Sequence, residues 1–113
     1  MSALFGNDRT MIDQVRAAAD ASGELVWELP LHRPYRKEID SLTADLMNCA
    51  PVGKPDAIIA SLFLAHFVGD VPWAHLDIAG PMNAESDSGW KSKGAIGFGT
   101  RTLIDFACTF APA

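Results

Sequence analysis

Residues 73–82 read WAHLDIAGPM, and this stretch is where a strand pattern runs directly into a glycine–proline turn. Successive side chains of an extended chain point to opposite faces, so the apolar residues at its second, fourth and sixth positions share one face. The aromatic and polar residues between them share the other face. A proline precedes the stretch and Gly80-Pro81 closes it, which limits the strand to about six residues. The stretch therefore predicts a short strand in an α/β core.

Composition places the chain among ordinary globular proteins. Of its 113 residues, 49% are apolar and 20% are charged, a balance that suits one core, so we expect residues 1–113 to form a single domain. The formal charge is −5 and the longest basic cluster is Arg36-Lys37, so nucleic acid is not an expected partner. The apolar run 57–67 is too short to cross a bilayer, and the N-terminus does not resemble a signal peptide. We expect a cytoplasmic protein with no membrane partner.

The two cysteines lie far apart in the sequence. Neither Cys49 nor Cys108 belongs to a CxxC or Cys/His spacing, so no zinc or redox motif is indicated. A free cysteine is usually buried like a small apolar residue, and free thiols fit a reducing cytoplasm. We expect two buried thiols, while a disulfide between them stays open.

Helix and strand patterns alternate along the chain. Apolar residues recur at helical spacing over 8–22, Asn7 and Asp8 offer a turn and an N-cap, and Gly23 stands at the usual C-terminal cap position. The other predicted segments of the first half are an apolar start at 3–5, a strand at 25–29, a strand or irregular stretch at 41–48 and a linker at 51–55. Residues 32–37, HRPYRK, could bind phosphate, but a solvated loop or single helical turn is the favoured interpretation.

A second helix begins at Asp56 and ends before Gly69. It is apolar almost all round, so we expect it to lie between the sheet and another layer, or inside an oligomer. His66 lies within it, and a histidine at the core boundary is favoured over a metal ligand.

Three glycines fall at positions 94, 97 and 99. A glycine-rich loop before a helix can cradle phosphate, but neither GxGxxG nor GxxxxGK[ST] is present. Close backbone packing at a loop-to-helix junction is the favoured interpretation. A final helix is predicted over 100–110, with one apolar face made of Leu103, Ile104, Ala107 and Phe110.

The order of these elements predicts an α/β fold with a mostly parallel sheet flanked by helices. The strands are few for a complete domain of this class. We therefore expect an incomplete three-layer α/β/α arrangement.

Few side chains are placed for catalysis. His75 and Asp77 share a strand face and could form an oriented base, although anchoring a strand end is the favoured role. Glu85 and Asp87 could bind a hard cation, but they belong to a polar loop and are expected to be solvated. No GxSxG elbow occurs, and the three histidines have no zinc-like spacing. The residues by themselves predict an α/β domain without an assigned reaction.

A longer pattern points to a family. WAHLDIAG at 73–80, followed by GAIGFGTRTL at 94–103, closely resembles the C-terminal end of the leucine (cytosol) aminopeptidase family. The family pattern there reads approximately WAHLDIAG, a variable loop, then KGATGFGVRTL. The similarity continues upstream, through LFGND at 4–8 and SGE at 22–24, and covers essentially the whole chain in order.

The resemblance implies a C-terminal fragment of an aminopeptidase catalytic domain. Family members are typically hexamers that remove N-terminal residues, leucine among them, from peptides. They use two divalent ions, zinc or manganese, about 3.5–4 Å apart to activate a water. Their ligands lie largely in a segment reading NTDAEGRL and in another upstream of it, and neither segment occurs here. We therefore expect no bound metal, no catalytic residue in this chain and no peptidase activity from the chain alone.

Two positions carry a role over from the family. The residues that match Ala79 and Met82 help to line the apolar pocket that receives the first side chain of the substrate. Here a small residue would leave space and a flexible thioether would fill it. The alternative is a turn packed on the core.

A different class of function is a stand-alone binding or structural module that kept this fold without its chemistry. In either case a partial α/β domain exposes sheet edge and apolar helix surface, notably around 56–68. We therefore expect the chain to self-associate.

Overall fold

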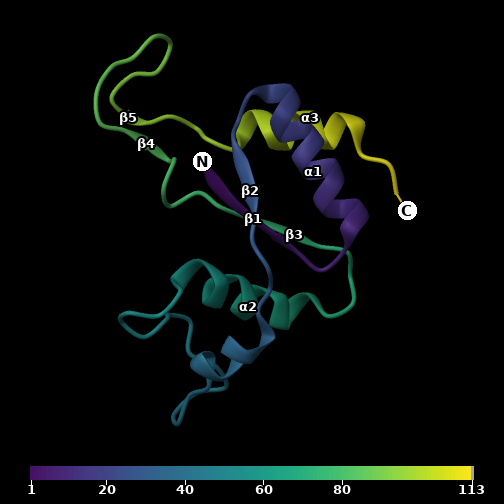
Figure 1. Ribbon diagram of the computed structural model, residues 1–113, viewed down its shortest axis with the longest axis vertical. Helices are drawn as coiled ribbons and strands as arrows, with labels where there is room; N and C mark the ends of the chain where they lie inside the picture. Colours follow the sequence, from purple (N-terminus) through teal and green to yellow (C-terminus); the bar gives the residue numbers. More distant parts are fainter. Residues whose placement is uncertain (113) are drawn as a thin grey trace.

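The computed structural model describes residues 1–112. Its elements, in order, are β1 (Ser2–Gly6), α1 (Arg9–Ser22), β2 (Val26–Glu28), the 3₁₀ helix η1 (Arg33–Ile39), α2 (Asp56–Val68), β3 (Ala74–Asp77), β4 (Asn83–Ala84), β5 (Gly94–Ala95) and α3 (Thr100–Thr109) (Figure 1). The predicted helices over 8–22, from Asp56, and over 100–110 are all present. Residues 41–48 are irregular, and residues 33–37 of the polar segment 32–37 form the start of η1.

The main sheet has three strands in the order β2-β1-β3. β1 pairs with β2 in parallel and with β3 antiparallel, so the sheet is mixed rather than mostly parallel. The first two strands are joined by a crossover through α1, which brings the chain back in the same direction. The long segment between β2 and β3 instead begins and ends at the same end of the sheet, so β3 runs in the opposite direction to the other two strands.

The helix α1 forms because its two ends and its apolar spacing agree. The Asp8 side chain accepts a hydrogen bond from the Met11 amide, and Gly23 closes the helix in the left-handed region with φ 68°. Ile12 and Val15 face the sheet and pack with Leu4 of β1 in the core. The apolar residues of the opening strand pattern, Ala74 and Leu76, pack against the same cluster.

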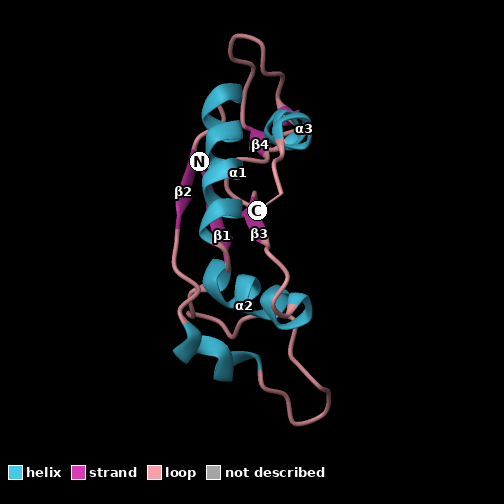
Figure 2. Cartoon of the chain, turned by 90° about the vertical axis from the view of Figure 1, so that its right-hand side faces the viewer, coloured by secondary structure: helices cyan, strands magenta, loops and turns pink. Residues whose placement is uncertain are grey.

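The molecule has three layers, as expected for the α/β class. α1 and α3 lie on one side of the sheet, and α2 with η1 lies on the other (Figures 1 and 2). Phe5 points away from α1 and is fully buried, as are Ile39 of η1 and Ile59 of α2. The second core therefore belongs to the α2 side of the sheet.

The helix α2 is less enclosed than its composition predicts. Only Ile59, Ser61 and Leu62 are buried, whereas Phe67 is 67% exposed. One sheet and one short 3₁₀ helix cannot surround a helix that is apolar all round. Part of its apolar surface is left facing outward.

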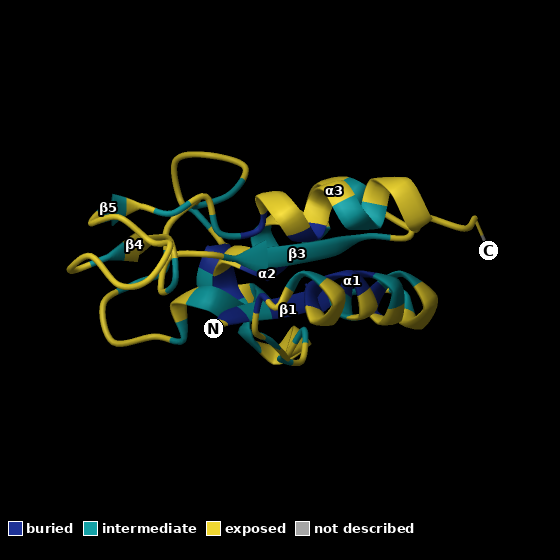
Figure 3. Cartoon of the chain, turned by 90° about the horizontal axis from the view of Figure 1, so that it is seen from above, coloured by how far each residue is buried: buried dark blue, intermediate teal, exposed yellow. Residues whose placement is uncertain are grey.

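The helix α3 also departs from the prediction, as Figure 3 shows. Its expected apolar face is mostly exposed, with Leu103 at 56% and Ile104 at 59%. The side of the helix that meets α1 carries Thr102, which is fully buried, and Phe106, which packs against the core. Polar contacts at its N-terminus, described below, set this rotation.

Both cysteines are free, and both are exposed rather than buried. Cys49 lies in the irregular segment before α2, outside the helices and strands, and Cys108 lies on the exposed side of α3, which explains the difference from the expectation.

Candidate functional site

The turn that follows β3 is held by hydrogen bonds at each step. The Ser2 hydroxyl donates to the Asp77 carbonyl at 2.6 Å, which fixes the end of β3 against β1. The Asp77 side chain accepts from the Ala79 amide at 3.0 Å, the local pattern of an Asx turn. The Met82 amide then donates to the Ile78 carbonyl at 3.0 Å. Residues 77–82 therefore form an ordered turn.

A second attachment ties this turn to the glycine-rich segment. β4 pairs with β5 antiparallel, with Asn83 opposite Ala95 and Ala84 opposite Gly94. The Ile96 amide donates to the Met82 carbonyl at 3.0 Å and continues the same ladder. The turn and the glycine-rich segment are thus one hydrogen-bonded unit.

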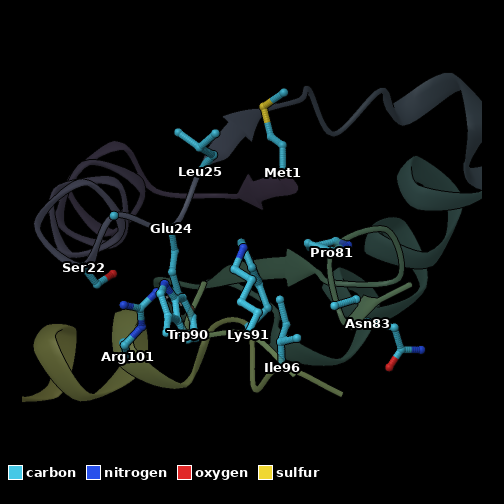
Figure 4. Close-up of a pocket in the computed structure, with 13 residues that line it drawn as sticks. Met1, Ser22, Glu24, Leu25, Pro81, Asn83, Trp90, Lys91, Ile96 and Arg101 are labelled. Carbon is cyan, nitrogen blue, oxygen red and sulfur yellow. Dashed lines mark ion pairs between the residues drawn. The ribbon is translucent and has the colours of Figure 1, made fainter. Parts of the chain in front are cut away.

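A pocket of about 590 Å³ lies beside this unit (Figure 4). Its walls come from the residues just before β1 and β2, from the end of α1, from β4 and from the loop that carries Trp90 and Lys91. The segment 96–98 and the first turn of α3 complete the lining. Pro81 and Asn83, which flank Met82, belong to its lining, whereas Met82 and Ala79 do not. Ala79 is exposed and Met82 is 45% exposed, so both residues are accessible to solvent.

One wall of the pocket combines an aromatic ring with two cations. The Arg101 guanidinium lies 4.7 Å from the centre of the Trp90 ring, and the Lys91 ammonium lies 5.4 Å from it. Both distances are within the range of cation–π attraction. Figure 4 shows the Glu24 side chain reaching down to the same wall.

The glutamate at this wall is the residue that sequence reasoning missed. Glu24 is 5% exposed, and its carboxylate accepts from the Gly99 amide, the Thr102 amide and the Thr102 hydroxyl at 3.1, 3.1 and 2.6 Å. Arg101 forms an ion pair with it at 3.6 Å. Only a long-range fold brings these groups together, so no local pattern could have identified the site.

Electrostatics at Glu24 favour the ionised form. Burial on its own raises the pKa of a carboxyl, but here the hydrogen bonds from Thr102 and Gly99 and the charge of Arg101 outweigh it and lower the pKa of Glu24. Because the Gly99 and Thr102 amides donate to it, the Glu24 carboxylate occupies the anion-binding position at the N-terminus of α3. The phosphate-cradle interpretation of the glycines is wrong for this reason.

The glycines instead serve backbone conformation. Gly97 and Gly99 have φ of 65° and 88°, values that L side chains rarely adopt. A side chain at either position would meet no atom closer than 3.6 Å, so close packing is not the constraint. The junction between loop and helix was predicted correctly, but its physical reason is positive φ.

His75 and Asp77 do not form an oriented base. The His75 ring is stacked on the Trp73 ring, with ring centres 6.0 Å apart and an angle of 7° between the planes. It is also stacked on the ring of Phe5, its pairing partner on β1. Burial lowers the pKa of His75, and the Asp77 charge opposes that change only in part. The Asp77 carboxylate is engaged by the Ala79 amide instead. Both residues act as scaffold at the end of β3.

The donor groups of this chain do not fit the metal centre that the family resemblance implies. Over residues 1–112, no three His, Cys, Asp or Glu side chains come together in a way that could hold a metal ion. Glu85 is exposed, and Asp87 accepts a hydrogen bond from the Lys93 amide at 2.7 Å within the polar loop. The His66 ring packs edge-on against Phe67. In the same residues, no helix is both long and apolar enough to span a membrane.

Comparison with known proteins places this geometry in a family. The model of the cytosol aminopeptidase family, catalytic domain, matches residues 1–104. This chain belongs to the cytosol aminopeptidase family. Among curated relatives, a probable cytosol aminopeptidase of Synechococcus sp. strain JA-3-3Ab is 45% identical over 106 residues, and that of Rippkaea orientalis is 43% identical over 110 residues. These matches cover 94% and 97% of this chain but only 21% and 22% of the relatives.

Solved structures agree with this assignment to the aminopeptidase family. A cytosol aminopeptidase from Coxiella burnetii is 32% identical with a TM-score of 0.81, over 97% of this chain and 24% of that one. The bottromycin maturation enzyme BotP in complex with Mn is 40% identical with a TM-score of 0.83, over 93% and 23% of the two chains. A tomato leucine aminopeptidase mutant is 36% identical with a TM-score of 0.80, over 93% and 20%. This chain therefore spans about one fifth to one quarter of the length of the proteins that it matches.

Proposed function

We propose that this chain is the C-terminal part of a two-metal leucyl aminopeptidase catalytic domain and forms part of the wall of its substrate pocket. The observation that supports this most directly is the match of residues 1–104 to the family's catalytic domain, together with the one-fifth coverage of the relatives. A single catalytic unit would then need sequence that this chain does not contain.

The two parts would divide the chemistry between them. In a two-metal peptidase, the ions bind the substrate and activate a water for attack on the peptide carbonyl. Because the donor groups of residues 1–112 do not fit such a centre, we assign this chain no metal ligand and no catalytic residue. Its contribution would be recognition of the substrate's first side chain.

Ala79 and Met82 would supply that recognition. Both side chains lie on a turn that is held at Asp77, at Ile78 and at Ile96, so their backbone is fixed in advance. The small Ala79 leaves room beside the turn, and the thioether of Met82 can adjust to side chains of different shape. An apolar first residue such as leucine suits this pair.

The remaining parts of the proposal follow the relatives. The substrate would be the N-terminus of a peptide and the location would be the cytoplasm, in line with the relatives' names. The assembled enzyme would be a homo-oligomer such as a hexamer, which only the family resemblance implies. Zinc or manganese would be the metal, and the Mn complex of BotP supports the second choice.

A hybrid enzyme tests the proposal. This chain would replace the matching segment of the Rippkaea orientalis protein, with which it shares 43% identity. We expect the hybrid to hydrolyse leucine p-nitroanilide in a metal-dependent way. We expect the isolated chain to show no turnover with excess zinc, manganese or cobalt, and the Rippkaea protein without its segment to show none either.

Two outcomes would contradict the proposal. Metal-dependent turnover by the purified chain alone, after contamination controls, would place the active site within it. A folded hybrid without activity would favour the alternative, a stand-alone binding or structural module.

A further inference from the structure

The first turn of α3 is fastened to the end of α1 through one buried carboxylate. Glu24 directly follows the Gly23 cap of α1, and its Oε2 atom receives three hydrogen bonds from Gly99 and Thr102. The Ser22 hydroxyl lies 3.1 Å from the Thr102 hydroxyl and completes the cluster. No buried side-chain polar atom in residues 1–112 lacks a hydrogen-bond partner, so the cluster is fully satisfied.

A short route leads from this carboxylate to the proposed pocket wall. Gly99, which Glu24 holds, lies three residues after Ile96, and the Ile96 amide is bonded to the Met82 carbonyl. Glu24 therefore fixes one end of the segment 96–99, and the other end, Ile96, is hydrogen-bonded to Met82. The backbone between the two anchors includes Gly97, with φ of 65°, and a glycine restricts the backbone less than any other residue once an anchor is lost.

Gly99 also lies near the beginning of the turn. A side-chain carbon built at Gly99 would lie 3.9 Å from the Ile78 Cγ2 atom, so Gly99 stands beside the residue that precedes Ala79. The end of the turn at 79–82 is thus bonded to the segment that Glu24 secures, and its start lies near the same segment.

The charge of Glu24 matters as well as its shape. Three donors converge on one oxygen, and the Arg101 guanidinium faces the other oxygen at 3.6 Å. A glutamine at this position keeps the volume but has only one acceptor oxygen, and its amide would face donors on one side. Hydrogen bonds to a charged acceptor are also stronger than those to a neutral one.

We propose that Glu24 is a positioning residue for substrate selection, because it holds the segment that supports Ala79 and Met82. This inference rests on the proposed function for its meaning in the enzyme. The linkage between Glu24 and the Met82 turn can be measured in this chain without the rest of the enzyme.

The linkage is tested by hydrogen exchange on the full chain, followed by mass spectrometry. In Glu24→Gln we expect the amides of Gly99, Thr102, Ile96 and Met82 to exchange at least about tenfold faster. A factor of about ten in rate corresponds to the loss of one charge-assisted hydrogen bond. The amides inside α1 should accelerate less, by no more than the loss in the free energy of unfolding requires. Glu28→Gln is the matched control, since it removes a glutamate four residues further on that pairs with Arg9 and Arg16 on the α1 side of the sheet.

Two patterns of exchange would overturn the linkage. Faster exchange at Gly99 and Thr102 with unchanged rates at Ile96 and Met82 would confine the role of Glu24 to the helix end. Faster exchange of all amides by the same factor would show only a general contribution to stability. Thr102→Val, which removes only the hydroxyl donor, should reproduce the local pattern more weakly, and its failure to do so would also count against the linkage.

The hybrid enzyme then tests selection separately. If the hybrid is active, Glu24→Gln should raise the KM for leucine p-nitroanilide by roughly threefold to tenfold while kcat changes by less than about twofold. Glu28→Gln should change neither. An active hybrid whose KM is insensitive to Glu24→Gln overturns the inference and leaves the proposed function intact. An inactive parent hybrid overturns the proposed function, and the exchange experiment still decides the linkage.

Discussion

The Thr102 hydroxyl donates to the Glu24 carboxylate across 2.6 Å, although 78 residues separate the two in the sequence. Both side chains are buried, at 0% and 5% exposure. A hydrogen bond to a charged acceptor in a buried position is among the stronger polar contacts of a small domain. This contact connects α1 to α3 and, through the glycine-rich segment, to the turn after β3.

Removing that hydroxyl should destabilise the fold. Thr102→Val keeps the side-chain shape, and we expect the free energy of unfolding to fall by about 1–3 kcal/mol. Urea unfolding followed by circular dichroism measures the change. Thr109→Val is the control on the same helix, because the Thr109 hydroxyl bonds only to the Asp105 carbonyl at the exposed side. A loss from Thr102→Val no greater than that from the control would contradict a special role for the contact.

The free energy of unfolding should decrease in two stages as the pH is lowered. Burial lowers the pKa of His75 from 6.5, so the unfolded state binds more protons below about that pH and stability decreases as pH falls. Hydrogen bonds lower the pKa values of Glu24 and Glu28 from 4.5; their contributions are present above that value and are lost as pH falls through the folded pKa values. Urea midpoints between pH 8 and pH 3 should show both stages. His75→Gln should remove only the first stage, and Glu24→Gln should weaken the second.

Gly99 should not tolerate a side chain. Its φ is 88°, and Gly99→Ala should cost roughly 1–2 kcal/mol of unfolding free energy because an L residue is strained there. Gly80→Ala is the control, since the φ of Gly80 is not positive and its nearest neighbour to an added carbon is 3.8 Å away. Thermal unfolding of the two variants compares them directly. Equal melting temperatures would show that backbone strain at Gly99 is unimportant.

A larger side chain at position 79, in the proposed substrate pocket of the assembled enzyme, should change the preferred substrate. In the hybrid enzyme, we expect Ala79→Val to lower kcat/KM for a leucine substrate by about 10- to 200-fold, the range for one or two misplaced methyl groups, and to affect an alanine substrate much less. Ala17→Val, at an exposed position of α1, is the control for the added volume. Equal losses for leucine and alanine substrates would mean that Ala79 does not contact the first side chain.

The isolated chain should self-associate through its exposed apolar surfaces. Phe67 of α2 is 67% exposed and Ile104 of α3 is 59% exposed, and both stand beside other exposed apolar side chains. Sedimentation at micromolar concentration should show oligomers, and the double change Phe67→Glu with Ile104→Glu should shift the chain toward monomer. A stable monomer of the unaltered chain would contradict this expectation.

Local patterns in the sequence were sufficient for the elements that are held by local forces. The cap at Asp8, the helical spacing of Ile12 and Val15, and the left-handed Gly23 lie within one helix, so their effect does not depend on the rest of the fold. The strand at 74–77 is similarly bounded by its own prolines and glycine. The family resemblance also came from contiguous residues, and the match over 1–104 confirms it.

The tertiary structure alone decided how these elements meet. Nothing near β3 specifies that it runs antiparallel to β1, because that direction depends on the path of the 45 residues between β2 and β3. Likewise the apolar face of α3 predicted burial, yet buried Thr102 and its partner Glu24 turn that face outward.

The opening stretch shows both sides of this division. Its sequence by itself determined a short strand, a turn and membership of the aminopeptidase family. Only the folded chain decided that Asp77 caps the turn, that His75 stacks between aromatic rings, and that a distant carboxylate supports the Met82 side. The physical reason is the same in each case: hydrogen bonds and stacking depend on neighbours in space, and the chain must fold before those neighbours exist.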